Sequence, residues 1–455
     1  MGINSLLASN LIDVAVDGIG TINLSWIGYI IKWIFDLFSG MPGAIALGAI
    51  VFTLALKTIV LPLDIYSRVK MRKQSLLMDS MRGDMEKLQQ QYANDKNMYN
   101  QKVMELQRAN GYNPLGACLP TIISLVIFMA VFSSFSQYSQ FANLSSYNAM
   151  AKEYSNAVQT YVLTSDRDSS NSEYFLIAAV EDGKNNPVPN TDIKYEEGRF
   201  VDSEGEEVNI YGYFVDYDKF ASYYSSVIGT SSTADTADPL PADWSILDDV
   251  SKNDFVKDFV RYGARQAAAD YYHAHRAENS FPTGKWWIGN VWYPDSMFNK
   301  EVPSFSDFRN AISRAVGNTS IDSTYEESYN EVTYNLQKEK NTYNGYFVLI
   351  VLAIGLMFLQ QFITMRAQKA ASELSTVDGQ GATTNKMMMI MMPIIFGFFS
   401  FMYSAAFSIY MIVNTTYSLI STLIINKVVS VRFKNETEKQ SLRKAAGRAG
   451  RKRLK

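Results

Sequence analysis

Long apolar runs separated by charged segments dominate the pattern of this chain. Five runs are each about 20 residues long, enough for a helix to cross the ~30 Å hydrocarbon core of a bilayer. They lie at 43–63, 117–135, 345–365, 387–405 and 407–426. Almost no polar residue separates the last two, so we expect a tight hairpin around Tyr403, Ser404 and Ala405, with one long kinked helix as the alternative. The pattern predicts a mainly α, polytopic membrane helical bundle with five transmembrane helices.

The charged residues beside these runs predict an orientation. Four basic residues follow the first run: Arg68, Lys70, Arg72 and Lys73. The segment before that run carries three aspartates and a single lysine, and residues 427–455 carry 11 Lys or Arg. Because basic residues gather on the cytoplasmic side of a membrane, the N-terminus is expected outside and the C-terminus inside.

Combining runs and charges gives ten predicted segments. In chain order they are an extracytoplasmic N-terminus 1–42, a first span 43–66, a cytoplasmic helical hairpin 67–113, a second span 114–136, an extracytoplasmic inserted domain 137–344, a third span 345–365, a cytoplasmic loop 366–386, a fourth span 387–405, a fifth span 407–427 and a basic cytoplasmic tail 428–455.

Two of these segments carry a helical pattern outside the spans. Residues 22–40 are rich in Trp, Ile and Phe but hold Lys32 and Asp36 four apart, which is typical of an amphipathic helix in the outer interface; a sixth crossing is the alternative. In 67–112, apolar residues recur at helical spacing: Met71, Met78, Met81, Met85, Leu88 and Tyr92, then Tyr99, Val103 and Leu106. We expect these two stripes to pack against each other, while a Met-rich client-binding surface is the alternative.

The segment 137–344 has a different composition from the rest. It holds 17 basic and 32 acidic residues, and short alternating stretches such as YFLIAAV, FVDSEGEEVNIYGYFVDY and WWIGNVWY. These stretches predict strands, and the segment as a whole an α+β domain with a loop near 231–243. His273 and His275 are the only histidines and have no third ligand candidate, so a packing or surface role is favoured over a metal site.

Other features restrict the chemistry further. The single cysteine, Cys118, excludes an internal disulfide. The first residues lack the basic start and compact apolar core of a cleaved signal, so the N-terminus is expected to remain. No H-E-x-x-H, G-x-S-x-G or P-loop motif is present, so we expect no enzymatic activity and no cofactor.

Lys57 is the most informative single residue. It lies in the first apolar run, 11 residues or ~16 Å along a helix from Arg68, farther than a lysine side chain can reach. A charge inside a span costs at least ~2.5 kcal/mol and usually faces a bundle interior or watery cavity. Thr53, one turn earlier, and Thr58 extend this polar stripe. We expect a functional polar cavity here, with partial snorkelling of Lys57 as the alternative.

Several motifs together resemble one family. The run TLALKTIVLPL, a charged helical hairpin, NPLGACLP at 113–120, and MMMIMMPIIFGFFSFMYSAAFSIYMIVNTTYSLISTLIINK with Pro393 and Tyr410 resemble the core of YidC-type membrane protein insertases, whose relatives include the mitochondrial Oxa and chloroplast Albino proteins. The resemblance covers about 40–136 and 345–430. The chain departs from the family in having Lys57 where Arg is common, and in the long insertion between the second and third spans.

The resemblance implies a function and a site. Such proteins insert and chaperone nascent membrane proteins through a hydrophilic groove in the bacterial cell membrane. The candidate groove and client-binding residues are Lys57, Thr53, Gln360, Gln361, Phe128, Phe396, Tyr410, Met411 and Asn414. The basic tail suits RNA or acidic lipid, and the resemblance implies a ribosome; the candidate contacts are Arg443, Lys444, Arg448, Arg451, Lys452, Arg453 and Lys455. A Sec translocon is a further candidate partner, and no small-molecule substrate is expected.

Two rival functions remain open at this point. A transporter or channel would bind an anionic solute at Lys57, although no inverted repeat is visible and the other spans contain few polar residues. A surface receptor would bind its ligand with the inserted domain, independently of Lys57. Solute flux in vesicles and ligand binding by residues 140–340 would separate these from an insertase.

Overall fold

The computed structural model is mainly helical, and it describes residues 16, 18–111, 114–161, 174–181, 194–196, 199–201, 205, 210–228, 246–281, 288–313, 323, 325–367 and 380–453. The chain folds into two compact units, each assembled from segments that are far apart in the sequence. Unit 1 comprises 1–22, 141–276 and 302–342, and unit 2 comprises 23–140, 277–301 and 343–455.

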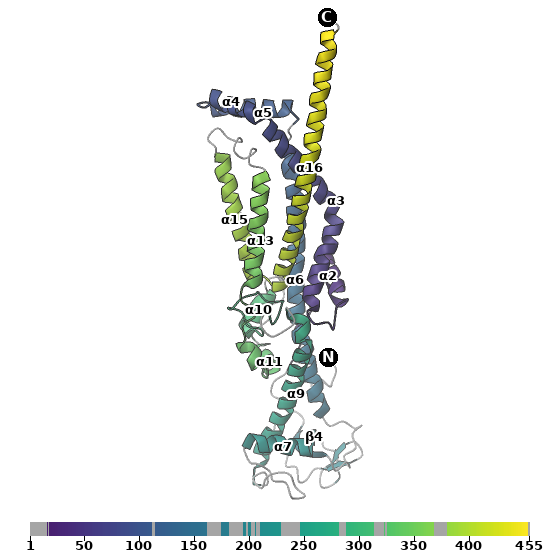
Figure 1. The fold of residues 1–455 in the computed structure, drawn as a ribbon. Coiled ribbons are helices and arrows are strands. Elements are labelled where there is room, and N and C mark those ends of the chain that lie inside the picture. Colours follow the sequence, from purple (N-terminus) through teal and green to yellow (C-terminus); the bar gives the residue numbers. More distant parts are fainter. Residues whose placement is uncertain are drawn as a thin grey trace. The chain divides into compact units, whose positions relative to one another are not determined.

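Unit 2 holds the long apolar helices (Figure 1). Its elements are α2 (Trp26–Asp36), α3 (Ala44–Ser80), α4 (Arg82–Gln91), α5 (Lys96–Ala109), the first part of α6 (Pro114–Tyr161), α13 (Val348–Ala367), α15 (Gln380–Met402) and α16 (Ala405–Arg453). α16 packs along α3, and α13 packs against both α15 and α16. Among the residues described, three helices are long and apolar enough to cross a membrane, at Ala44–Ser80, Val348–Arg366 and Ala405–Arg432.

Three helices of unit 2 continue past the predicted ends of their spans. α3 reaches Ser80 instead of ending near residue 66, α6 reaches Tyr161, and α16 reaches Arg453. A change from apolar to polar residues marks the end of a membrane span, but it does not end the helix itself. In α3 no Gly lies between Pro62 and Gly83 to interrupt the helix. The break between α15 and α16 does fall at Tyr403 and Ser404, where the hairpin was predicted.

The two apolar stripes at 67–112 pack together. Met78, Met81 and Met85 form a buried cluster with Tyr99 and Val103. Leu77, Leu88, Tyr92 and Leu106 pack around this cluster; Met71 is not part of it. On α2, Trp26 and Trp33 are exposed while Ile31 and Phe35 are buried on its other face, and the location of this helix in the membrane interface stays a prediction.

Unit 1 combines helices with short strands. Its elements are the second part of α6, β1 (Tyr174–Glu181), β2 (Lys194–Glu196), β3 (Arg199–Val201), β4 (Ile210–Asp216), α7 (Tyr217–Ile228), α9 (Asp249–Asn279), α10 (Phe305–Ser313), α11 (Tyr325–Val332) and α12 (Gln337–Asn341). β1 pairs antiparallel with β4, and β2 with β3. The core combines aliphatic residues with aromatic residues such as Tyr147, Phe220 and Tyr329.

One predicted strand is reduced to a single antiparallel bridge in the described residues, between Ile288 and Phe281. In WWIGNVWY, residues 286 and 287 lie outside the described residues, and 289–293 form turns. These turns bring main-chain oxygens to the start of α16: Ala405 N donates to Tyr293 O at 2.9 Å and Ala406 N to Val291 O at 2.9 Å. Beyond Ile288, backbone groups of this stretch therefore cap a helix instead of extending a strand.

Candidate functional site

Lys57 lies in α3 on the face that packs against α16. Its Nζ is 5.7 Å from the centroid of the Tyr417 ring, a cation–π contact that partly replaces the water lost by the ammonium group. Thr53, one turn earlier, is fully buried and its Oγ1 donates to Ala49 O at 2.6 Å. Thr53 thus satisfies its own hydroxyl proton and keeps only acceptor capacity.

Further polar groups continue along the same face of α3. Asp64 and Arg68 follow Lys57 by 7 and 11 residues, which places all three on one side of a helix. Arg68 Nε is 3.0 Å from Asp64 Oδ1, with side chains 14% and 12% exposed. Arg68 Nη1 also donates to Ser418 O at 3.1 Å and to Thr422 Oγ1 on α16.

We call these six residues the polar seam: Lys57, Asp64, Arg68, Tyr417, Ser418 and Thr422. The seam extends beyond them in α3, since Arg72 donates to Ser430 Oγ at 3.0 Å. Asn414 precedes Ser418 by one helical turn and so belongs to the same stripe of α16. In this apolar bundle the seam gathers cations, one carboxylate and hydroxyl groups between two helices.

Two predicted polar neighbours of Lys57 lie on another helix. Gln360 and Gln361 are half-buried on α13, and among the described residues no contact joins them to Lys57. The described contact of the Lys57 ammonium group is the Tyr417 ring. The sequence held a signal for this arrangement in the i, i+7, i+11 spacing on α3 and in the four-residue spacing of Asn414, Ser418 and Thr422.

Two of the predicted apolar client contacts, Phe128 and Tyr410, lie in an aromatic cluster. Phe128 stacks on Phe132 with ring centroids 6.0 Å apart, and Tyr410 lies 5.4 Å from Phe135. Tyr410 is 2% and Met411 is 3% exposed, so both contribute to packing inside unit 2. The side chain of Phe396 and those of the basic tail residues Arg443, Lys444, Arg448, Arg451, Lys452 and Arg453 lie outside the described part of the structure, as does Lys455.

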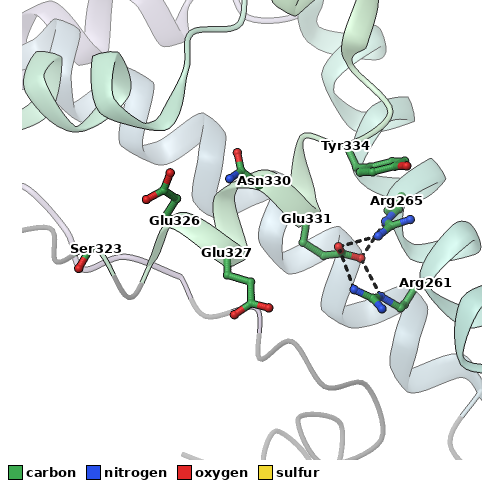
Figure 2. Close-up of a pocket in the computed structure, with 8 residues that line it drawn as sticks. All are labelled: Arg261, Arg265, Ser323, Glu326, Glu327, Asn330, Glu331 and Tyr334. Carbon is green, nitrogen blue, oxygen red and sulfur yellow. Dashed lines mark hydrogen bonds and ion pairs between the residues drawn. The ribbon is translucent and has the colours of Figure 1, made fainter.

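Unit 1 has a separate polar pocket of about 450 Å³ (Figure 2). Arg261 and Arg265, one turn apart on α9, both point at Glu331 of α11. Arg265 also lies over the Tyr334 ring, 3.9 Å from its centroid. His273 Nε2 is 3.2 Å from Glu339 Oε1, and the His275 ring stacks on Tyr271 at 4.2 Å. Among the residues described, no three His, Cys, Asp or Glu side chains are grouped as metal ligands.

With this geometry in place, comparison with known proteins assigns the family. The family model described as the 60Kd inner membrane protein matches residues 37–178 and 308–433, which is more than half of the chain. The chain belongs to this family. It is therefore a multi-pass protein of the inner membrane, in agreement with its apolar helices.

Individual members of the 60Kd inner membrane protein family match shorter stretches. Three proteins named membrane protein insertase YidC are similar to this chain: that of Fusobacterium nucleatum is 40% identical over 90 residues, that of Treponema pallidum 29% over 112, and that of Francisella philomiragia 29% over 130. These alignments cover 20%, 25% and 28% of this chain and 42%, 17% and 23% of the relatives. The chain thus spans less than half the length of the curated relatives that it matches. No solved structure matches significantly.

Proposed function

We propose that this protein is a membrane protein insertase and chaperone that moves polar tails of client proteins along the polar seam and releases their apolar segments into lipid. Lys57 carries the proposal. It is a cation inside an apolar helix, and its ammonium group contacts an aromatic ring instead of a carboxylate. The family membership and the names of the relatives support the same activity.

The physical basis is the cost of moving polar groups through lipid. Each unsatisfied backbone group in hydrocarbon costs several kcal/mol, so a hydrophilic groove that reaches part of the way shortens the unfavourable path. Lys57 would pair with a carboxylate of the tail. Thr53 is fully buried and Thr422 Oγ1 already accepts from Arg68, so their hydroxyl oxygens would accept hydrogen bonds from tail amides only after the client displaces these neighbours. Asn414 can both donate and accept.

The apolar segment of the client provides the driving force. Once it leaves the polar seam for lipid, burial of its apolar surface lowers the free energy by roughly 25 cal/mol per Å². No nucleotide is needed for this step, so the protein is proposed to act without enzymatic activity or a cofactor. A membrane potential positive outside would assist an acidic tail by ~2.3 kcal/mol per charge per 100 mV.

The proposed topology has five spans with the N-terminus outside and the C-terminus inside. α3, α13 and α16 provide three of them, and the first part of α6 together with α15 would provide the others. The helical hairpin of α4 and α5 and the end of α16 are then cytoplasmic. Unit 1 would be the extracytoplasmic α+β domain, with β1 to β4 as its strands.

The partners follow from this topology. Nascent membrane proteins and lipid are the proposed partners in the bilayer. The 11 basic residues of 427–455 suit a ribosome or acidic lipid on the cytoplasmic side, and a Sec translocon is a further candidate.

Insertion into liposomes tests the function directly. We would measure protease protection of a short acidic tail on a single-span client, with liposomes that hold the intact protein or its variants. The intact protein and Lys57→Arg are expected to protect the tail, Lys57→Ala to protect less, and Lys57→Glu to protect none. Lys87→Glu is the matched control, because Lys87 is 80% exposed on α4.

Two results would contradict the proposal. If the intact protein protects no more tail than empty liposomes, insertase activity is excluded under conditions where an established insertase works. If Lys57→Glu protects as much tail as the intact protein, insertion does not use the polar seam.

A further inference from the structure

Asp64 is the one acidic member of the polar seam. Its side chain is 12% exposed, and Arg68 Nε donates to its Oδ1 at 3.0 Å. The second oxygen, Oδ2, is buried and has no hydrogen-bond partner among the described residues. A buried carboxylate oxygen without a donor is unfavourable, so this atom has capacity for one more donor.

Neighbouring cations in the seam do not fill that capacity. Arg68 is held on α16 by Ser418 O at 3.1 Å and by Thr422 Oγ1, which fixes its guanidinium group on the Oδ1 side. The ammonium group of Lys57 lies over the Tyr417 ring and forms no ion pair with Asp64. Arg68, which links α3 to α16, therefore occupies only the Oδ1 atom of Asp64.

Charges alternate along this face of α3. Lys57, Asp64 and Arg68 read positive, negative, positive over 11 residues, and of the three only Lys57 forms no ion pair with another described residue. An anionic group of a client would pair with Lys57. A cationic group about two helical turns along would meet Asp64 Oδ2, since seven residues rise ~10 Å in a helix.

We propose that Asp64 is a cation-accepting subsite of the polar seam, which binds a Lys or Arg side chain in the polar tail of a client. The inference rests on the proposed insertase function and extends it to substrate class. With Lys57 and Asp64 together the seam accepts tails of mixed charge, whereas Lys57 alone favours acidic tails. Asp64 then determines specificity.

Two tails of equal length test this subsite, one with a single Lys and one with a single Glu among neutral residues. Fluorescent peptides of each tail are titrated against the full-length protein in phosphatidylcholine nanodiscs, and clients with the same tails are inserted into phosphatidylcholine liposomes. Neutral lipid removes the surface potential that would otherwise concentrate one peptide.

The Asp64→Asn variant should affect the two tails in opposite directions. Losing a charge-assisted hydrogen bond weakens binding of the Lys tail by about tenfold. Binding of the Glu tail rises, because a repelling carboxylate is gone. Asp84→Asn, an exposed substitution on α4, changes neither.

A double variant distinguishes direct binding of the tail by Asp64 from a general effect of the net charge of the polar seam. Asp64→Asn with Arg68→Gln removes one charge of each sign, so the net charge of the seam stays as in the intact protein. If Asp64 contacts the tail, the double variant also binds the Lys tail about tenfold more weakly. The double variant also leaves no unpaired Arg68, so it covers the case in which Asp64→Asn alone fails to fold.

The outcomes distinguish this inference from the proposed function. If the double variant restores binding of the Lys tail, or if neither variant weakens it, Asp64 is not a subsite. The same holds if the intact protein binds no Lys tail. If the intact protein binds both tails in nanodiscs but inserts neither client, the insertase function fails while the effect of Asp64→Asn on binding still decides the inference.

Discussion

Each of the two units buries a carboxylate between helices, and the two carboxylates differ in how fully they are paired. In unit 1, Glu331 is 6% exposed in its side chain and receives Tyr154 Oη at 3.0 Å and two bonds from Arg265 at 2.7 and 2.8 Å, with Arg261 at 3.3 and 3.4 Å. In unit 2, Asp64 receives Arg68 on one oxygen only. Both oxygens of Glu331 accept hydrogen bonds, which join α6, α9 and α11, so Glu331 has no free acceptor for a ligand. Asp64 keeps one oxygen that can accept a further donor.

Removing the saturated carboxylate should have the largest effect on stability. Glu331→Ala leaves two arginines and a tyrosine without their acceptor, and breaking a buried ion pair in this way costs about 3–5 kcal/mol. Hydrogen exchange of the α9 amides is the measurement, because it reports opening of unit 1 by itself. Glu327→Ala, one turn earlier and exposed, should stay within about 0.5 kcal/mol of the intact protein. Equal exchange rates in the two variants would show that Glu331 is not a structural link.

Asp295 is a third buried acidic residue, and it differs from Glu331 and Asp64 because its hydrogen-bond donors are backbone N–H groups and not arginines. It is fully buried, and its carboxylate accepts from the N–H groups of Tyr346, Phe347 and Leu349 at 2.7–3.0 Å. Asp295→Ala leaves the start of α13 without this cap and should cost about 2 kcal/mol, or roughly 30-fold faster exchange of those amides. Asp254→Ala, exposed on α9, is the control. Unchanged exchange at 346–349 would contradict the capping role.

Acidification should act on unit 1 through Glu331. Burial alone would raise the pKa of this carboxyl, but the hydrogen bonds and charges of Arg265 and Arg261 outweigh it and the pKa is lowered. Because the folded-state pKa lies below the unfolded one, the stabilisation is present above pH ~4.5 and is lost as the pH falls through the folded value. Denaturation of the intact protein between pH 7 and 3 should show this loss, and Glu331→Gln should reduce the slope. An equal slope in both would assign the pH dependence to other groups.

An exposed ion pair should have the smallest effect. Lys32 Nζ and Asp36 Oδ2 are 2.5 Å apart on α2, but their side chains are 39% and 56% exposed. Asp36→Asn should change stability by less than about 0.5 kcal/mol and should lose even that effect in high salt. If thermal unfolding showed a change above about 1 kcal/mol in the free energy of unfolding, the Lys32–Asp36 ion pair would stabilise the protein in spite of its exposure to solvent.

Helical spacing predicted contacts within short stretches of the chain. The apolar stripe at Met78, Met81 and Met85 and its partner at Tyr99 and Val103 follow from three- and four-residue periodicity, and the structure packs them together. The break near Tyr403 follows from two apolar runs that are together too long for a single span. The unusual position of Lys57 was also visible, because a charge in an apolar run stands out.

Helical spacing could not predict contacts between residues that are far apart in the sequence. Tyr417 lies 360 residues from Lys57, and periodicity says which face of a helix is polar but not which helix it meets. The assignment of Gln360 and Gln361 to the same site as Lys57 rests on polarity and stays a prediction. Likewise, Asp295 and Glu331 look like ordinary acidic residues of 137–344, since only the fold brings three backbone N–H groups to one and two arginines to the other.

The turns at 289–293 and the Asp295 that follows them make the helix bundle depend on residues of the insertion. They lie outside the two ranges matched by the family, yet they supply the first hydrogen bonds of α16 and the cap of α13. Excising the insertion along its sequence boundaries would therefore remove part of the bundle, and a transplant into another family member would need to carry residues 288–301 with it.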